Sequence, residues 1–185
     1  TSIVEAGWAV WSGGARGIDA AAHEAALARG GLTVVVSPSG HDVPYPPEHA
    51  ELFARVIASG GTLVTPFADG DKPKLFAFHH RNHLLAALTL ATVMVEAGEK
   101  SGARSTARAA RRLGRPLFVV PQAPWEPKGI GCARELARGA RAITRGEDVV
   151  AGLREKPRPL RDPSPRRTSA PHAHAHGEHT HAHAL

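Results

Sequence analysis

The sequence is poor in the residues that mark secreted, membrane or disulfide-linked proteins. It has one cysteine, Cys132, among 185 residues, which excludes an internal disulfide and fits a reducing compartment. No apolar run approaches the roughly 20 residues that span a bilayer, and no secretory signal follows Thr1. We therefore expect a cytoplasmic protein.

The best-known nucleotide and catalytic fingerprints are missing as well. The segment SGGARGID at 12–19 fits neither G-x-G-x-x-G nor G-x-x-x-x-G-K-[ST], and neither G-x-S-x-G nor H-E-x-x-H occurs. Asp19 and His23 share a helix face, but their spacing is more typical of a cap and a surface pair than of an acid–base dyad. Cys132 has no evident base. These absences predict a protein without catalytic residues and without a bound cofactor.

What the chain does contain is an alternation of short apolar runs and longer helical patterns up to about Leu153. The apolar runs are too short for helices, and several are rich in valine, as buried strands are. This alternation predicts an open, doubly wound α/β domain at 1–153, with a mostly parallel sheet and helices on both faces. The predicted strands are 8–11, 32–36, 62–65, 91–95 and 117–120, and the predicted helices are 18–29, 47–59, 81–90, 102–113 and 131–138.

The composition changes at residue 154. Residues 154–185 are rich in proline and arginine and end in alternating histidine and alanine, so they cannot bury enough apolar surface to offset the entropy of ordering. We expect a disordered tail that carries a net charge of +3 out of the total of +6. Its histidines form no firm metal site but can bind Ni²⁺, Cu²⁺ or Zn²⁺ weakly; they are His172, His174, His176, His179, His181 and His183.

The first candidate site is the glycine turn between a predicted strand and a predicted helix. Glycines allow a ligand to approach the backbone closely, and the start of a helix offers unpaired N–H groups to an anion. In open α/β sheets such loops gather at the carboxyl ends of the strands, where ligands bind. A tight turn without a ligand is the alternative. The predicted phosphate site consists of Ser12, Gly13, Gly14, Arg16 and Gly17.

The second candidate site is the segment FAFHHRNH at 76–83. Arg81 can bind phosphate through its guanidinium fork, and Asn82, at the expected start of a helix, can cap that helix or contact a base edge. Phe76 and Phe78 can stack on an unpaired base or lie in the core. Three histidines have partial metal-ligand spacing but lack a cysteine or carboxylate cluster, so we expect no zinc site; they are His79, His80 and His83.

The third candidate site begins at Ser101 and Gly102, where another helix is expected to follow a strand. No acidic residue lies between Lys100 and Arg115, and the arginine spacing places five of them on one face of this helix. A solvated outer face and a surface for a polyanion both explain this pattern. The five are Arg104, Arg108, Arg111, Arg112 and Arg115.

Five motifs in order carry a resemblance to a known family. They are SGGARGID at 12–19 with the following AAAH, DVPYPPEHAELF at 42–53, F-x-x-RN-x-x-x-A-x-L at 78–88, VEAGEKSGARSTA at 95–107 and G-x-x-x-x-L-x-x-GA at 131–140. Together they resemble the DprA/Smf family, the DNA-processing proteins of natural transformation, over most of residues 1–150.

The resemblance implies a Rossmann-like domain that binds single-stranded DNA, forms a homodimer and helps load a RecA-type recombinase onto incoming strands, without catalytic turnover. It places Arg16, Arg81 and Asn82 at the DNA-binding pocket, and Ser101, Gly102 and Thr106 on its neighbouring wall. The family's domain normally begins with one more strand, which ends in a G-x-R loop, and many relatives carry a C-terminal winged helix. The sequence here has neither, so we expect a fold that is N-terminally truncated relative to the family. His79 and His83 stand where the family has Pro and Arg.

An enzyme is the alternative function. Nucleotide phosphoribohydrolases share this architecture and an SGG-type loop, and they carry P-G-G-x-G-T-x-x-E after a later strand. The corresponding stretch here, EAGEKSGARSTA at 96–107, has neither the paired glycines nor a downstream glutamate. The leading hypothesis is therefore a non-enzymatic protein that binds single-stranded DNA during DNA uptake.

Overall fold

The strands form two parallel sheets of three strands each. The computed structural model describes residues 2–155. In the first sheet β1 (Val10–Ser12), β2 (Thr33–Val36) and β3 (Thr62–Val64) lie in that order. In the second, β4 (Thr92–Met94), β5 (Leu117–Val119) and β6 (Arg141–Ala142) follow in the same way. All pairs are parallel, with Val35 beside Ser12 and Leu63, and Val119 beside Met94 and Ala142.

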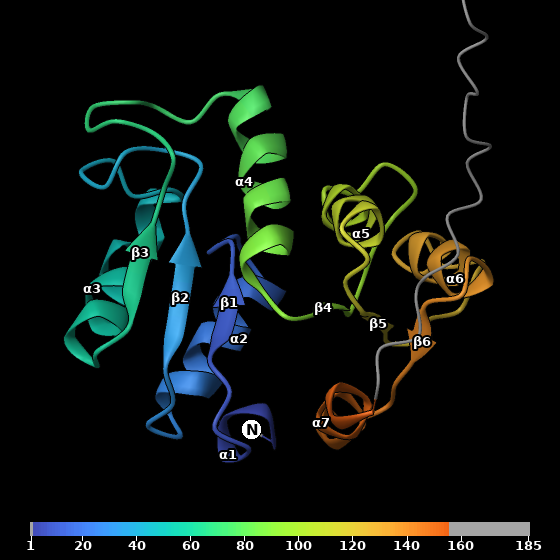
Figure 1. The fold of residues 1–185 in the computed structure, drawn as a ribbon. Helices are drawn as coiled ribbons and strands as arrows, with labels where there is room; N and C mark the ends of the chain where they lie inside the picture. The colour runs from blue at the N-terminus through green and yellow to red at the C-terminus, as the bar shows by residue number, and fades with distance from the viewer. Residues whose placement is uncertain (1, 156–185) are drawn as a thin grey trace, which may run out of the picture.

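The helices connect and flank these strands, as Figure 1 shows. In the first half α1 (Ser2–Glu5) precedes β1, α2 (Ile18–Leu27) joins β1 to β2, and η1 (Pro47–His49) with α3 (Ala50–Ala58) joins β2 to β3. The long helix α4 (Leu75–Leu88) leads from the first sheet to the second, and α5 (Ala103–Arg112) joins β4 to β5. Then α6 (Ile130–Ala137) and α7 (Gly146–Arg154) lie before and after β6.

Each sheet has its own apolar core because its central strand is buried on both faces. Val35 of β2 packs with Leu52, Phe53 and Val56 of α3. In the second sheet, strands β4 and β5 pack against Ala107 of α5 and Cys132 of α6. Helices α4 and α5 pack against each other through small residues, Ala86 on one and Ala109 and Ala110 on the other. This close packing fixes α5 relative to α4, and both helices carry predicted site residues.

The predicted α/β class with parallel strands and flanking helices is confirmed. The five predicted strands and five predicted helices all exist, with shorter strands than expected. The expectation of one continuous sheet is wrong for the described residues, where β1 and β4 each pair on one side alone. Strand β6 and helices α1 and α7 were not predicted, because β6 has two exposed residues and no apolar pattern to reveal it.

The largest boundary error concerns α4. The helix begins at Leu75, not at Arg81, so Arg81 and Asn82 lie in its middle and Asn82 is not its cap. The run from Leu75 to His80 contains no glycine or proline, so nothing in it interrupts the helix. None of the helices in the described part of the chain is long and apolar enough to cross a membrane. The predicted disordered tail lies outside the described residues beyond position 155.

Candidate nucleic-acid interface

A groove with a volume of about 690 Å³ runs between the start of α2 and the end of β4. One wall comes from the glycine turn and α2, and the other from β4, the segment after it and the start of α5. The fold therefore brings the first and third predicted sites together. Its lining residues include Arg16, Gly17, Asp19, Glu96, Ser101 and Lys128.

Asp19 holds the glycine turn in shape. Its Oδ2 accepts hydrogen bonds from the backbone N–H groups of Gly13 and Ala15, both at 3.2 Å. Two backbone N–H groups of the predicted phosphate loop are therefore already paired within the turn. Gly17, with φ of 83°, then leads directly into α2.

Arg81 lies beneath this turn and is nearly buried, with 6% of its surface exposed. Its Nη1 donates to the backbone oxygen of Val36 at 3.4 Å and lies 4.0 Å from Asp19 Oδ2, while Nε has no partner in the described part of the chain. Burial lowers the pKa of the Arg81 guanidinium, and the charge of Asp19 opposes this. Arg81 thus supports the turn from below and is not among the residues that line the groove.

The neighbouring wall is organised by Asn82. Its Nδ2 donates to the backbone oxygen of Gly102 at 3.2 Å and so connects the middle of α4 to the start of α5. Ser101 Oγ accepts a hydrogen bond from the backbone N–H of Ala103, also at 3.2 Å. Thr106 is buried, with 8% of its surface exposed. Of these predicted residues, Ser101 faces the groove, and Asn82 and Thr106 lie behind it.

The charged groups that line the groove balance one another. Lys128 Nζ lies 3.2 Å from Glu96 Oε2, and Asp19 is the second carboxylate. Arg16 is exposed and pairs with Glu48, which is outside the groove lining. Sequence reasoning missed Lys128, because a single lysine in a Pro-rich loop carries no pattern. The charged side chains that line the groove therefore carry no excess of positive charge.

The five arginines predicted on one helix face do not share one exposed surface, so that expectation is wrong for three of them, and Arg115 lies beyond the end of α5. Arg111 donates to the buried Glu135 of α6, and Arg104 Nε lies 3.5 Å from the same carboxylate. Arg115 Nη2 donates to the backbone oxygen of Ala87 at 3.0 Å. The neutralising acid comes from another helix, so the sequence of α5 gave no sign of it. Arg108 and Arg112 are exposed.

The aromatic residues near the start of α4 are only partly available for stacking. Phe78 is half-buried and packs edge-to-face on Tyr45, with ring centroids 5.5 Å apart. Phe76 is 61% exposed and packs edge-to-face with Phe67 at 6.2 Å. Of the two, Phe76 offers more open ring surface to a base.

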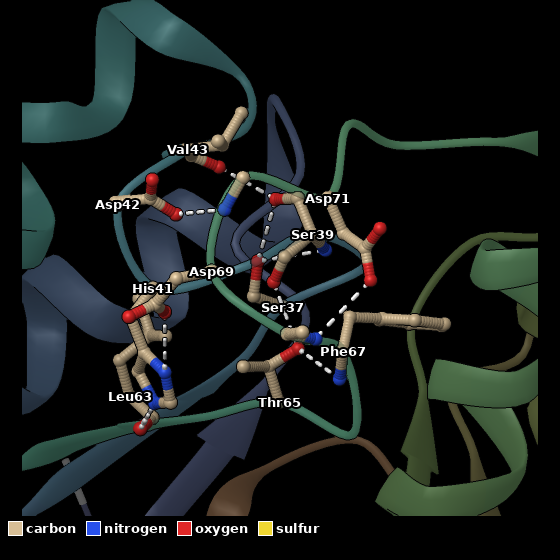
Figure 2. A network of polar contacts seen from close by, with 12 residues as sticks. Ser37, Ser39, His41, Asp42, Val43, Leu63, Thr65, Phe67, Asp69 and Asp71 are labelled. Atoms are coloured by element: carbon tan, nitrogen blue, oxygen red, sulfur yellow. Dashed lines mark hydrogen bonds and ion pairs between the residues drawn. The ribbon is translucent and has the colours of Figure 1, made fainter.

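Figure 2 shows a polar network at the carboxyl ends of β2 and β3. Thr65 Oγ1 donates to the backbone oxygen of Ser39 at 2.8 Å and accepts from the N–H of Phe67 at 3.2 Å. Asp42 Oδ1 accepts from the N–H of Gly70 at 2.7 Å. These bonds join the loop after β2 to the loop after β3 and so fix the segment that leads into α4. Because its polar groups pair with each other, this edge of the first sheet serves as a support for the site.

His23 and Cys132, two residues with side chains capable of catalysis, are buried. His23 is fully buried and its Nδ1 lies 2.7 Å from Thr33 Oγ1, so the predicted surface pair with Asp19 is wrong. Burial lowers the pKa of His23, and the charge of Asp19 opposes this. Cys132 is buried, and burial raises the pKa of its thiol. Within residues 2–155, no three His, Cys, Asp or Glu side chains come together as metal ligands. The tail histidines lie outside the described residues.

Comparison with known families decides the assignment. The family described as DNA recombination-mediator protein A matches residues 1–154. The chain belongs to this family. It is 46% identical over 148 residues to a Mycobacterium tuberculosis protein assigned as the DNA processing protein DprA. That alignment covers 80% of this chain and 38% of the relative, so the chain spans about two fifths of that relative's length.

Two solved structures of this family resemble the fold. DNA processing protein A of Streptococcus pneumoniae matches with a TM-score of 0.73 and 34% identity, over 80% of this chain and 52% of that one. The second is DNA processing protein A of Helicobacter pylori, which matches with a TM-score of 0.72 and 31% identity. Its structure is described as giving insight into a unique single-stranded DNA binding mode. The latter alignment covers 82% of this chain and 68% of that chain.

Proposed function

We propose that this protein binds single-stranded DNA during DNA uptake, protects incoming strands and promotes loading of a RecA-type recombinase, acting as a homodimer and without catalytic turnover. The groove carries the proposal. It brings the exposed Arg16 of the glycine turn and Ser101 at the start of α5 to opposite walls of one cavity. Membership of a DNA-processing family, one member of which is described as binding single-stranded DNA, supports the choice of ligand.

In this proposal, the predicted site residues that line the groove and those that support its walls have different roles. Arg16, Gly17 and Ser101 face the groove and contact phosphate directly. Arg81 and Asn82 hold the two walls, since one lies under the glycine turn and the other bonds to Gly102. Bases stack at the start of α4, where Phe76 and Phe78 lie.

A salt titration of oligonucleotide binding tests the proposal. Fluorescence anisotropy with labelled single-stranded and duplex DNA should show preference for the single strand, with log K falling by about 0.7 per phosphate contact against log salt. Arg16→Glu should weaken binding strongly. Its control, Arg29→Glu two residues beyond the end of α2, changes the same charge away from the groove lining and should not weaken DNA binding. Equal affinity for both DNA forms, or an unchanged Arg16→Glu variant, would overturn the proposal.

Three further measurements test the remaining parts of the proposal. Incubation with AMP should release no free base, and release would favour the phosphoribohydrolase alternative. Light scattering of the full chain should give the mass of a dimer. Addition of the protein should shorten the lag before a RecA-type recombinase covers a single strand.

A further inference from the structure

The outer face of α5 is a second cationic surface that is continuous with the groove. Arg108 and Arg112 are one turn apart on this helix and exposed. The ion pairs of α5 are made by Arg104 and Arg111, and within residues 2–155 Arg108 and Arg112 form none. The two guanidinium groups therefore face solvent without a neutralising carboxylate.

This surface begins at the groove wall. Ser105, Arg108 and Arg112 lie at spacings of three and four residues, which places all three on one face of α5. Ser101 lines the groove just before this helix, and the N–H of Arg104 donates to the backbone oxygen of Ser101 at 3.1 Å, so a single turn joins the groove wall to the start of α5. At a rise of 1.5 Å per residue, this line of side chains extends about 16 Å from the groove.

The helix beside it adds no negative charge. Helix α4 packs along α5, and neither helix contains an aspartate or a glutamate. On the α4 side the exposed His79 approaches this line, with Nδ1 3.5 Å from Ser105 Oγ, and His83 is exposed one turn further on. Figure 1 shows the two helices side by side. A polyanion that lies across this pair meets cations and polar groups and no carboxylate of α4 or α5.

We propose that Arg108 and Arg112 bind the phosphate backbone of a single strand where it leaves the groove, so that the α5 face extends the DNA path. This inference rests on the proposed function and adds a second contact region to it. The charge balance supports it, because the groove lining contains two carboxylates, whereas the α5 face has none. Of these two regions, the α5 face therefore contributes more to the long-range attraction of a polyanion.

The length of the oligonucleotide separates the two regions. With the full chain, dT oligomers of about 4 and about 25 nucleotides are compared, since single-strand sites on an OB fold, another small domain, span roughly 4–16 nucleotides and about four nucleotides are too short to cover both regions. Arg108→Gln/Arg112→Gln should leave the short oligomer's affinity unchanged. For the long oligomer it should remove the extra affinity and reduce the slope of log K against log salt by about 1.4, two contacts at about 0.7 each.

The matched control is Arg29→Gln/Arg55→Gln, which removes two exposed arginines of the α2–α3 region and should change neither oligomer. An unchanged long-oligomer affinity in the α5 variant overturns the inference and leaves the groove intact. Equal loss for both lengths also overturns it, because the arginines would then belong to the groove or to its fold. Failure of the unmodified protein to bind either oligomer defeats the proposed function itself. If an acidic protein binds to the α5 face through Arg108 and Arg112 and the long oligomer does not, the α5 face has a protein partner, and the inference is overturned.

Discussion

The guanidinium of Arg81 occupies the space that a side chain at position 13 would fill. A Cβ built on Gly13 would lie 1.2 Å from Nη1 of Arg81. The glycine turn is therefore shaped from inside the protein, by a buried cation on α4 and by the Asp19 carboxylate that accepts its N–H groups. The position of Arg81 is therefore one structural reason for glycine at position 13.

Replacement of Gly13 by alanine should therefore destabilise the protein. The methyl group forces Arg81 out of its buried place, and overpacking of this kind costs about 1–3 kcal/mol. Thermal unfolding should show a lower midpoint temperature for Gly13→Ala than for the unmodified protein. The control is Gly102→Ala, where the nearest atom to a new Cβ is Asn82 Nδ2 at 3.6 Å and φ is −57°. If Gly13→Ala unfolds at the same temperature as the unmodified protein, Arg81 is not fixed beneath the turn.

Arg16 and Arg81 should respond differently to lysine. Arg16 is exposed, so Arg16→Lys keeps the charge at the groove and should preserve most of the DNA affinity and all of the stability. Arg81→Lys removes Nη1, the atom that reaches both the backbone oxygen of Val36 and Asp19 Oδ2, and it leaves those groups poorly paired in a buried place. Urea unfolding and anisotropy on the same samples check both. A stable Arg81→Lys variant that has lost DNA binding would show that Arg81 contacts phosphate after all.

Glu135→Gln should be among the most destabilising single changes. Glu135 is 1% exposed and pairs with Arg111, Arg104 and Arg138. Loss of its charge leaves Arg111 buried without a counterion, which costs about 3–5 kcal/mol in buried pairs. Urea unfolding measures the change, and Arg134→Gln, at the half-exposed pair with Glu99, should cost less than about 1 kcal/mol.

If the Glu135→Gln variant does not fold, a double replacement tests the same ion pair. Arg111→Met/Glu135→Leu removes both buried charges of the closest pair and should recover much of the lost stability. A Glu135→Gln protein as stable as the unmodified one would mean that the carboxylate does not neutralise these arginines.

Stability should decrease in mildly acidic solution because of His23. In the unfolded chain this histidine titrates near its ordinary pKa of 6.5, whereas burial lowers its pKa in the folded protein. The unfolded state therefore binds the proton first, so the free energy of unfolding falls as the pH drops through about 6.5 towards the lowered folded value. Urea unfolding from about pH 8 to pH 5 should show this decrease, and His23→Gln should flatten it. Parallel curves for the two proteins would rule His23 out as the cause.

The sequence alone was enough to recognise the α/β class, because short valine-rich runs and Ala-rich helical patterns need only local periodicity to be recognised. It also located the glycine turn and the Ser101–Gly102 helix start, which the fold brings to one groove. Loops gather at the carboxyl ends of parallel strands, and here the two loops follow β1 and β4, which are edge strands of two different sheets. The ordered motifs then indicated the family that the match over residues 1–154 assigns.

Which of the charged side chains are free became clear only from the packing of the helices. Arg81 and Arg111 look like the other arginines in the sequence, yet one lies under the glycine turn and the other meets Glu135 from a helix 24 residues away. Ion pairing and burial depend on which helices pack together, and no local pattern encodes that. The predicted stripe of five arginines becomes two exposed ones, Arg108 and Arg112, and those two are the ones left to meet a polyanion.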